Sequence, residues 1–85
     1  MGAYRWNSLK SRRLKKLRGV SFEEIIKAKV VGVRTHPTRV GQKLMLFEYR
    51  GYVWAVPFVE HGDEMFLKTL YPSRYWTRKY ERGEL

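Results

Sequence analysis

The stretch "FLKTLYPSRYWTRKY", residues 66–80, intersperses cations with aromatic rings and contains no acidic residue. Cleaving RNA without a metal requires that the 2′-hydroxyl loses its proton, the pentavalent phosphate is stabilised and the leaving 5′-oxygen is protonated. Arg74 and Arg78 lie four residues apart, so they share one face of a predicted helix, and a guanidinium matches phosphate oxygens bidentately. Lys68 and Tyr80 can transfer protons if they are correctly placed, although Tyr80 points toward a different helix face.

His36 lies beside Pro37 in a predicted loop, between Arg34 and Arg39. A histidine there can act as a general acid or base, and the simpler interpretation, a solvated loop residue, has at least equal weight. Lys68 is a lone cation in an otherwise apolar strand. It either blocks edge-to-edge pairing of strands or contacts a phosphate, and the sequence favours neither.

The aromatic residues Tyr71, Tyr75 and Trp76 can stack on RNA bases. Each ring taken alone is better explained by closing a small hydrophobic core. The arginines favour the functional interpretation, because no neighbouring acid neutralises them. The candidate RNA-binding residues are these three rings together with Lys43, Arg50 and Lys79.

Composition excludes several classes of site. There is no cysteine, and the two histidines, His36 and His61, have no metal-ligand spacing, so we expect no metal and no cofactor. No apolar run reaches the roughly 20 residues that a membrane helix needs, and the basic start lacks the apolar stretch of a signal peptide. We therefore expect a cytoplasmic protein.

Charge is the strongest compositional signal. Lys and Arg number 18 against 8 Asp and Glu, which gives a net charge of +10 and a pI near 10.2. Such a field attracts polyanions: nucleic acid, an acidic protein or an anionic membrane. Thermophilic proteins are also rich in charge, but their charges tend to balance in ion-pair networks. The imbalance here favours a polyanionic partner.

Two helices are predicted at the start of the 85-residue chain, which we expect to form one domain over residues 1–85. The first begins at Asn7 or Ser8 and ends at Gly19. The second begins with a capping box formed by Ser21 and Glu24. We expect that helix to bury four apolar residues and to stop at Gly32. The four are Phe22, Ile25, Ile26 and Val30.

Strands are predicted over residues 43–50, 52–60 and 65–71, with a short additional strand near 31–35. Pro57 implies an edge position or a bulge in its strand, because proline cannot donate to the ladder. A short helix over about residues 73–82 ends the chain, with Ser73 as its cap. The fold class is therefore α+β, in which two N-terminal helices pack on one face of a small antiparallel sheet of three to four strands.

Three motifs in this order resemble the BrnT family of bacterial and archaeal type II toxins, within the wider RelE/ParE-like ribonuclease fold. They are "RWN" before a basic helix, "RGVSFEEI", and "PSRYWTRKY", which aligns the family's arginine, threonine and tyrosine with Arg74, Thr77 and Tyr80. A subgroup also has the His36-Pro37 pair, "YVWAVPFV" and "FLKT". The chain departs from the family where an arginine would fall at Thr69.

The resemblance implies a RelE/ParE-like fold and a metal-independent endoribonuclease that inhibits translation. It implies as partners RNA, which can be ribosome-associated mRNA, and a cognate antitoxin in a hetero-oligomeric complex. Phosphate binding would fall on Arg74 and Arg78, assisted by Lys68, Tyr80 and His36. The alternatives are a non-catalytic nucleic-acid binder and a module that only binds an antitoxin. The basic first helix fits both an RNA contact and the antitoxin dock.

Overall fold

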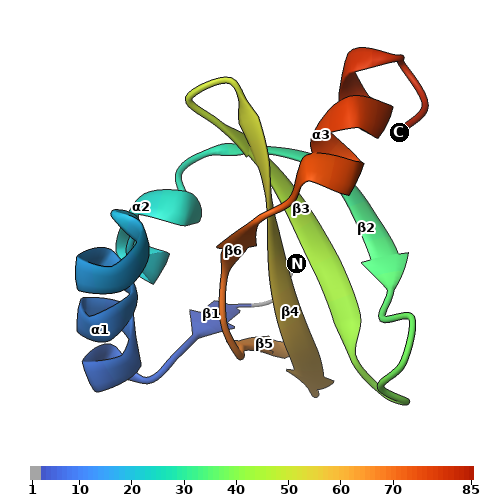
Figure 1. Ribbon diagram of the computed structural model, residues 1–85. Helices are drawn as coiled ribbons and strands as arrows, with labels where there is room; N and C mark the ends of the chain where they lie inside the picture. The colour runs from blue at the N-terminus through green and yellow to red at the C-terminus, as the bar shows by residue number, and fades with distance from the viewer. Residues whose placement is uncertain (1–2) are drawn as a thin grey trace.

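A mixed six-stranded sheet lies between helices on both of its faces (Figure 1). The computed structural model describes residues 3–85. Its elements, in chain order, are β1 (Ala3–Arg5), α1 (Ser8–Arg18), α2 (Phe22–Ile25), β2 (Lys29–Thr35), β3 (Lys43–Tyr49), β4 (Tyr52–His61), β5 (Glu64–Leu67), β6 (Tyr71–Pro72) and α3 (Arg74–Glu81).

The first helix follows its predicted signals. The Asn7 side chain accepts a hydrogen bond from the Lys10 backbone N–H at 3.0 Å, so Asn7 is the N-cap of α1. Gly19 ends the helix with a φ of 79°, and its N–H donates to the Lys15 carbonyl. Glycine suits this position because its left-handed conformation strains other residues.

The second helix has the predicted capping box, but it is much shorter than predicted. Ser21 and Glu24 exchange side-chain-to-backbone hydrogen bonds, and α2 then ends at Ile25. The prediction that Val30 belongs to a buried helix face is wrong, because Val30 lies in β2 and is 46% exposed. Gly32 does not stop a helix either; it lies at an irregularity in the β2–β3 register. Consecutive β-branched valines favour a strand there.

The capping box predicts acid-sensitive stability. Hydrogen bonds from the Lys15 ammonium and the Ser21 backbone N–H lower the pKa of Glu24 from 4.5 to about 2. A carboxylate whose pKa is depressed by folding stabilises the protein above its unfolded pKa, and this stability is lost as the pH falls from 4.5 through about 2. Glu24→Gln keeps a capping acceptor and removes the charge. We expect the urea midpoint of wild type to fall over this window more steeply than that of the variant; parallel curves would contradict the assignment.

The strand order is β1-β5-β4-β3-β2, with β6 also paired to β4. The predicted number of antiparallel strands, three to four, was too small. The prediction also missed β1, which pairs in parallel with β5 and places Ala3 opposite Glu64. A three-residue strand with a partner at the far end of the sequence leaves no local pattern. The other pairs are antiparallel, as predicted.

The predicted strand 65–71 divides into two. β5 ends at Leu67, the chain leaves the sheet over residues 68–70, and β6 then pairs with a different part of β4. Pro57 lies opposite this break, and its carbonyl accepts from the Lys68 N–H at 2.8 Å. Because the N and C=O of one strand residue point to the same side, the missing donor of Pro57 also faces the break. The prediction of an edge or bulge was therefore wrong, because Pro57 lies within the central strand β4. Its missing N–H removes no backbone hydrogen bond between β4 and β3.

Each face of the sheet has its own hydrophobic cluster. As predicted, α1 and α2 cover one face, where Leu14, Phe22 and Ile25 pack with Phe47 and Val56. On the other face, four small and medium side chains are covered by partly buried residues of α3 and its flanks, at the right of Figure 1. The four are Leu44, Leu46, Val53 and Ala55. The sheet core thus fixes the position of α3 relative to β2, β4 and β6.

Thr77 attaches α3 to the sheet. Its hydroxyl oxygen accepts from the Val53 N–H at 2.8 Å and donates to the Ser73 carbonyl at 2.6 Å. The Val53 carbonyl accepts from the Ser73 N–H at 2.9 Å, on the same side of β4. Thr77 thus supplies the acceptor that a longer β6 would have supplied. Ser73, as predicted, is the N-cap of α3, and its hydroxyl accepts from the Trp76 N–H.

Candidate functional site

A groove of about 470 Å³ opens where the chain leaves the sheet opposite Pro57. We call it the His36 groove. Its lining includes Lys10, His36, Arg39, Pro57, Lys68 and Tyr71. Five separate segments contribute: α1, the loop after β2, β4, the break after β5, and β6. The groove therefore joins two predicted catalytic residues, His36 and Lys68, to the predicted stacking residue Tyr71.

The His36 ring is held by its own loop. Its Nδ1 accepts hydrogen bonds from the backbone N–H groups of Thr38 and Arg39, at 3.2 and 3.1 Å. The His36 N–H donates to the Gln42 carbonyl at 3.0 Å and closes the loop. With the Nδ1 lone pair occupied, the neutral ring carries its proton on Nε2. His36 is thus fixed as a hydrogen-bond donor through Nε2–H rather than as a free base.

The second groove is aromatic and measures about 680 Å³. We call it the Trp76 groove; its lining includes Arg34, Pro37, Leu44, Tyr71, Tyr75 and Trp76. The rings of Tyr75 and Trp76 meet edge to face with centroids 4.9 Å apart, and the guanidinium of Arg34 lies 5.6 Å from the Trp76 ring centroid. Trp76 is half-buried against the core while Tyr75 is 60% exposed, so one ring is anchored and the other is free to contact a ligand.

The third groove lies along α3 and is lined by Arg74, Tyr75, Arg78, Lys79 and Arg82. We call it the Arg78 groove. Arg74 and Arg78 share it, as their helical spacing predicts. Lys79 is partly engaged, because its ammonium lies 3.5 Å from Glu84 and 5.5 Å from the Tyr75 ring centroid.

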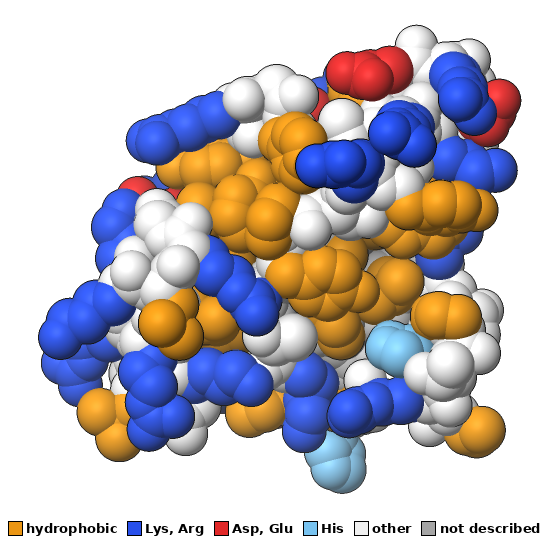
Figure 2. Space-filling model, viewed as in Figure 1, with side chains coloured by type: hydrophobic (Ala, Val, Ile, Leu, Met, Phe, Trp, Pro, Cys, Tyr) orange, Lys and Arg blue, Asp and Glu red, His pale blue; other side chains and the backbone are white. Residues whose placement is uncertain are grey.

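The three grooves are continuous. Tyr71 lines both the His36 groove and the Trp76 groove, and Tyr75 lines both the Trp76 groove and the Arg78 groove. Figure 2 shows hydrophobic side chains in the middle of this face, with Lys and Arg on both sides of them. Cationic sites thus flank an aromatic site, which matches the alternation of phosphates and bases along a nucleic-acid strand.

The comparisons with known proteins address the fold. A scan against protein-family models and a search of curated proteins found no match. Among solved structures, the crystal structure of the ribonuclease toxin BrnT of Brucella abortus matches with a TM-score of 0.58 and 20% sequence identity, over 86% of this chain and 97% of that chain. The chain has the BrnT fold. The resemblance indicated by three short motifs is thus confirmed for the fold of nearly the whole chain.

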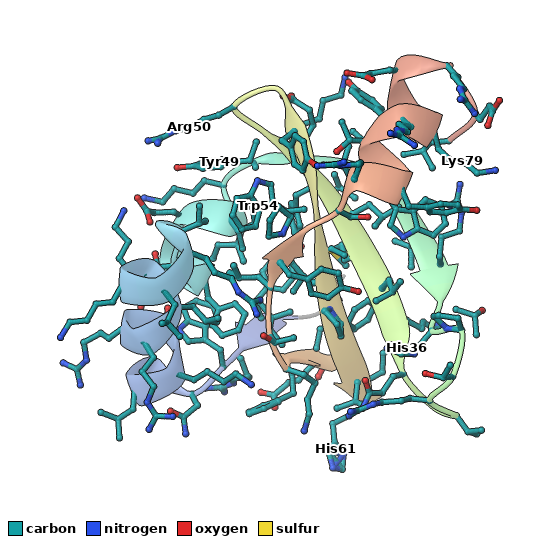
Figure 3. The ribbon with its side chains drawn as sticks, in the orientation of Figure 1. His36, Tyr49, Arg50, Trp54, His61 and Lys79 are labelled. Atoms are coloured by element: carbon teal, nitrogen blue, oxygen red, sulfur yellow. The ribbon has the colours of Figure 1, made fainter. Side chains whose placement is uncertain are left out.

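Three predicted site residues lie outside the three grooves of this BrnT-like fold. Tyr80 is half-buried and packs against the cluster under α3. Lys43 forms an ion pair with Glu60 at 2.9 Å. Arg50 occupies the β3–β4 turn, where its guanidinium lies 5.0 Å from the Tyr49 ring centroid. Figure 3 shows Arg50 at the opposite end of the sheet from His36.

Sequence reasoning did not assign site roles to Lys10, Arg34 and Arg39, which line the grooves. Arg34 and Arg39 could have been found, because both flank His36 in the sequence. Lys10 could not, since it meets Lys68 only through the folding of α1 beside the β5–β6 break. Its position in the BrnT-like fold depends on tertiary structure alone.

The charged Lys and Arg side chains that line the three grooves are all positive. None of the acidic residues lines any of the three grooves, and within residues 3–85 the ion pairs involve other cations, apart from Lys79. The Lys68 ammonium lies 5.4 Å from the ring centroid of Phe66. Lys10, Arg39 and Lys68 line the His36 groove and have no carboxylate partner in the described chain. In the same part of the chain, no cluster of three or more His, Asp or Glu side chains is arranged to hold a metal ion. The described helices are too short or too polar to cross a bilayer.

Proposed function

We propose that this protein is a toxin of a type II toxin–antitoxin system and acts as a metal-independent endoribonuclease. The observation that carries the proposal is the His36 groove, in which a histidine of fixed tautomer lies among cations that form no ion pair in the described chain. The BrnT fold supports it, since BrnT of Brucella abortus is a ribonuclease toxin. The aromatic Trp76 groove beside it supports a nucleic-acid substrate.

The scissile phosphate would lie in the His36 groove. The 2′-hydroxyl gives its proton to a solvent water in the exposed groove, and its oxygen forms a bond to phosphorus, while the bond from phosphorus to the 5′-oxygen breaks and leaves a 2′,3′-cyclic phosphate. The Nε2–H of His36 donates to a non-bridging oxygen and stabilises the phosphorane. Lys68 gives a proton to the leaving 5′-oxygen, because its side chain is exposed and lines the same groove. Lys10 and Arg39 add positive charge where negative charge accumulates.

The other two grooves would bind the nucleotides next to the cleaved bond. A base stacks on Tyr75 and Trp76 in the Trp76 groove, where the sheet core holds the Trp76 ring in place. Arg74 and Arg78 bind the following phosphate in the Arg78 groove. This division assigns proton transfer to one groove and strand positioning to another, whereas the sequence alone suggested that both arginines contact the reacting phosphate.

The biological setting belongs to the same proposal. Cleavage of mRNA would inhibit translation in the cytoplasm, and a cognate antitoxin would neutralise the protein in a hetero-oligomeric complex. The net charge of +10 supports an acidic partner that covers the grooves.

The first test uses end-labelled RNA with a chelator present. We expect wild type to cut at discrete positions. Arg74→Ala should raise KM about 10- to 100-fold and leave kcat within a few-fold, because a lost charged hydrogen bond costs about 1.5–3 kcal/mol. Arg50→Ala is the matched control and should leave both constants unchanged, since Arg50 lies at the other end of the sheet.

Each other outcome has a definite meaning. A large fall in kcat for Arg74→Ala would move the scissile phosphate to the Arg78 groove. Tight, salt-dependent binding without cleavage, on free RNA and on translating ribosomes, would replace the nuclease by a non-catalytic nucleic-acid binder.

A further inference from the structure

Two more grooves extend the site toward α1. The Phe66 groove lies between α1 and the end of β5, and the Arg12 groove lies on the outer face of α1. Lys10 and Lys68 line both the Phe66 groove and the His36 groove. The Phe66 and Arg12 grooves in turn share Leu9 and Arg13. Through these shared residues, the five grooves adjoin one another in a row from α1 to α3, which we call the track.

The outer face of α1 is not used by the fold. Leu9 is 61% exposed and Leu17 is 77% exposed. Arg12, Arg13 and Lys16 are exposed and form no ion pair within residues 3–85, in contrast to Lys15, whose ammonium lies 2.9 Å from Glu24. The helix itself contains no acidic residue. These charges repel one another in the free protein, so they are better explained by a ligand than by stability.

We propose that the outer face of α1 is a binding site for the backbone of single-stranded RNA, several nucleotides away from the cleaved bond. The inference rests on the proposed function, because it takes the occupant of the His36 groove to be RNA. Arg12, Arg13 and Lys16 would neutralise phosphates. The residues that line the Arg12 groove carry no aromatic ring, so the contact there would hold the strand without reading its bases.

The continuity of the track favours RNA over an acidic protein as the occupant. A strand seated in the His36 groove has to leave it, and the Phe66 groove is an exit lined by cations. Figure 2 shows Lys and Arg side chains at the left, over α1, on the same face as those over α3. The molecule measures 33 Å along its longest axis, so an RNA strand that follows this face contacts the protein through several nucleotides. A longer RNA should therefore bind more tightly than a short one.

The test measures affinity against RNA length. The probes are 2′-O-methyl oligonucleotides, a trinucleotide and a dodecanucleotide, which cannot be cut by attack of the 2′-oxygen. The variant R12Q/R13Q/K16Q removes the α1 charges, and K27Q/K29Q/R50Q removes the same net charge from exposed residues outside all five grooves. Circular dichroism and melting temperature establish that both variants fold.

We expect all three proteins to bind the trinucleotide within about twofold of one another. For the dodecanucleotide, the α1 variant should bind at least tenfold more weakly than the control variant, and its salt slope should be shallower by about 2, from roughly 0.7 per phosphate contact. Equal weakening by both variants would mean that only net charge matters and would overturn the proposal. An unchanged dependence of affinity on RNA length in the α1 variant would also overturn the proposal. The outer face of α1 would then be assigned to an acidic protein partner.

The same data separate this inference from the proposed function. If wild type binds the dodecanucleotide through α1 but never cuts unmodified RNA, the α1 site stands and the nuclease fails. If wild type cuts RNA and the α1 variant keeps full affinity for the long probe, the nuclease stands and the α1 site fails. If wild type binds neither probe, both fail.

Discussion

Replacing His36 with asparagine is expected to lower the rate of RNA cleavage about 100- to 1,000-fold, with little effect on RNA affinity. Asparagine places its side-chain oxygen near the position of Nδ1, so it can still accept from the backbone N–H groups of Thr38 and Arg39. The loop is then retained, and what is lost is the Nε2–H of a ring that lines the His36 groove. Single-turnover cleavage with a chelator present measures the effect.

Glutamine at the same position is the complementary variant. Its side-chain amide nitrogen reaches the place of Nε2 and donates a hydrogen bond, but it offers no acceptor at the Nδ1 position. If His36 acts as a neutral donor, His36→Gln should retain more cleavage than His36→Asn. If His36 instead transfers a proton, both variants should be equally inactive, and the alkaline or acidic limb of the wild-type pH profile should disappear in both. That result would contradict the role proposed from the geometry.

Replacing Thr77 with valine is expected to lower the free energy of unfolding by about 1–3 kcal/mol. The two side chains have similar shapes, but valine leaves the buried Val53 N–H without its acceptor. Ser73 loses less, because its carbonyl still accepts from the Thr77 backbone N–H at 3.0 Å. Urea denaturation gives the difference in stability.

Thr77→Ser is the matched control, since it keeps the hydroxyl and removes only a methyl group. It should retain most of the stability that Thr77→Val loses. An equal loss in both variants would show that packing of the methyl group, rather than the bond to β4, holds α3. The folded fraction of Thr77→Val should keep its trinucleotide affinity if α3 stays docked, so any loss of binding would report that the helix has shifted.

Local signals predicted much of this fold. The caps Asn7, Ser21 and Ser73 and the terminator Gly19 each act within a few residues, and each lies where the sequence indicates. The main strands were also predicted, because alternating or continuous apolar runs bury against helices. Errors came where a local pattern suited two structures. The segment around Val30 is compatible with a helix, and only pairing with β3 makes it a strand.

For the candidate site, the sequence predicted the types of residue better than their arrangement in space. His36 and Lys68 line the same groove because the chain leaves the sheet opposite Pro57, and no local sequence pattern indicates this break. Tyr80 aligns with the tyrosine of the motif that the chain resembles, but it is half-buried against the core, since the helix register turns it toward the sheet. Positions that depend on contacts between distant segments are the ones that sequence reasoning missed or left open.

The parallel pairing of β1 with β5 constrains when the protein becomes complete during its synthesis. Ala3 is synthesised before Glu64 and has to wait for it before it can join the sheet. Closing so long a loop is slow compared with forming α1 or the hairpin of β3 and β4. The His36 groove is lined by both Lys10 and Lys68, so it forms only after residue 68 has been made. A nascent chain that ends before β5 therefore has neither the complete sheet nor the complete His36 groove.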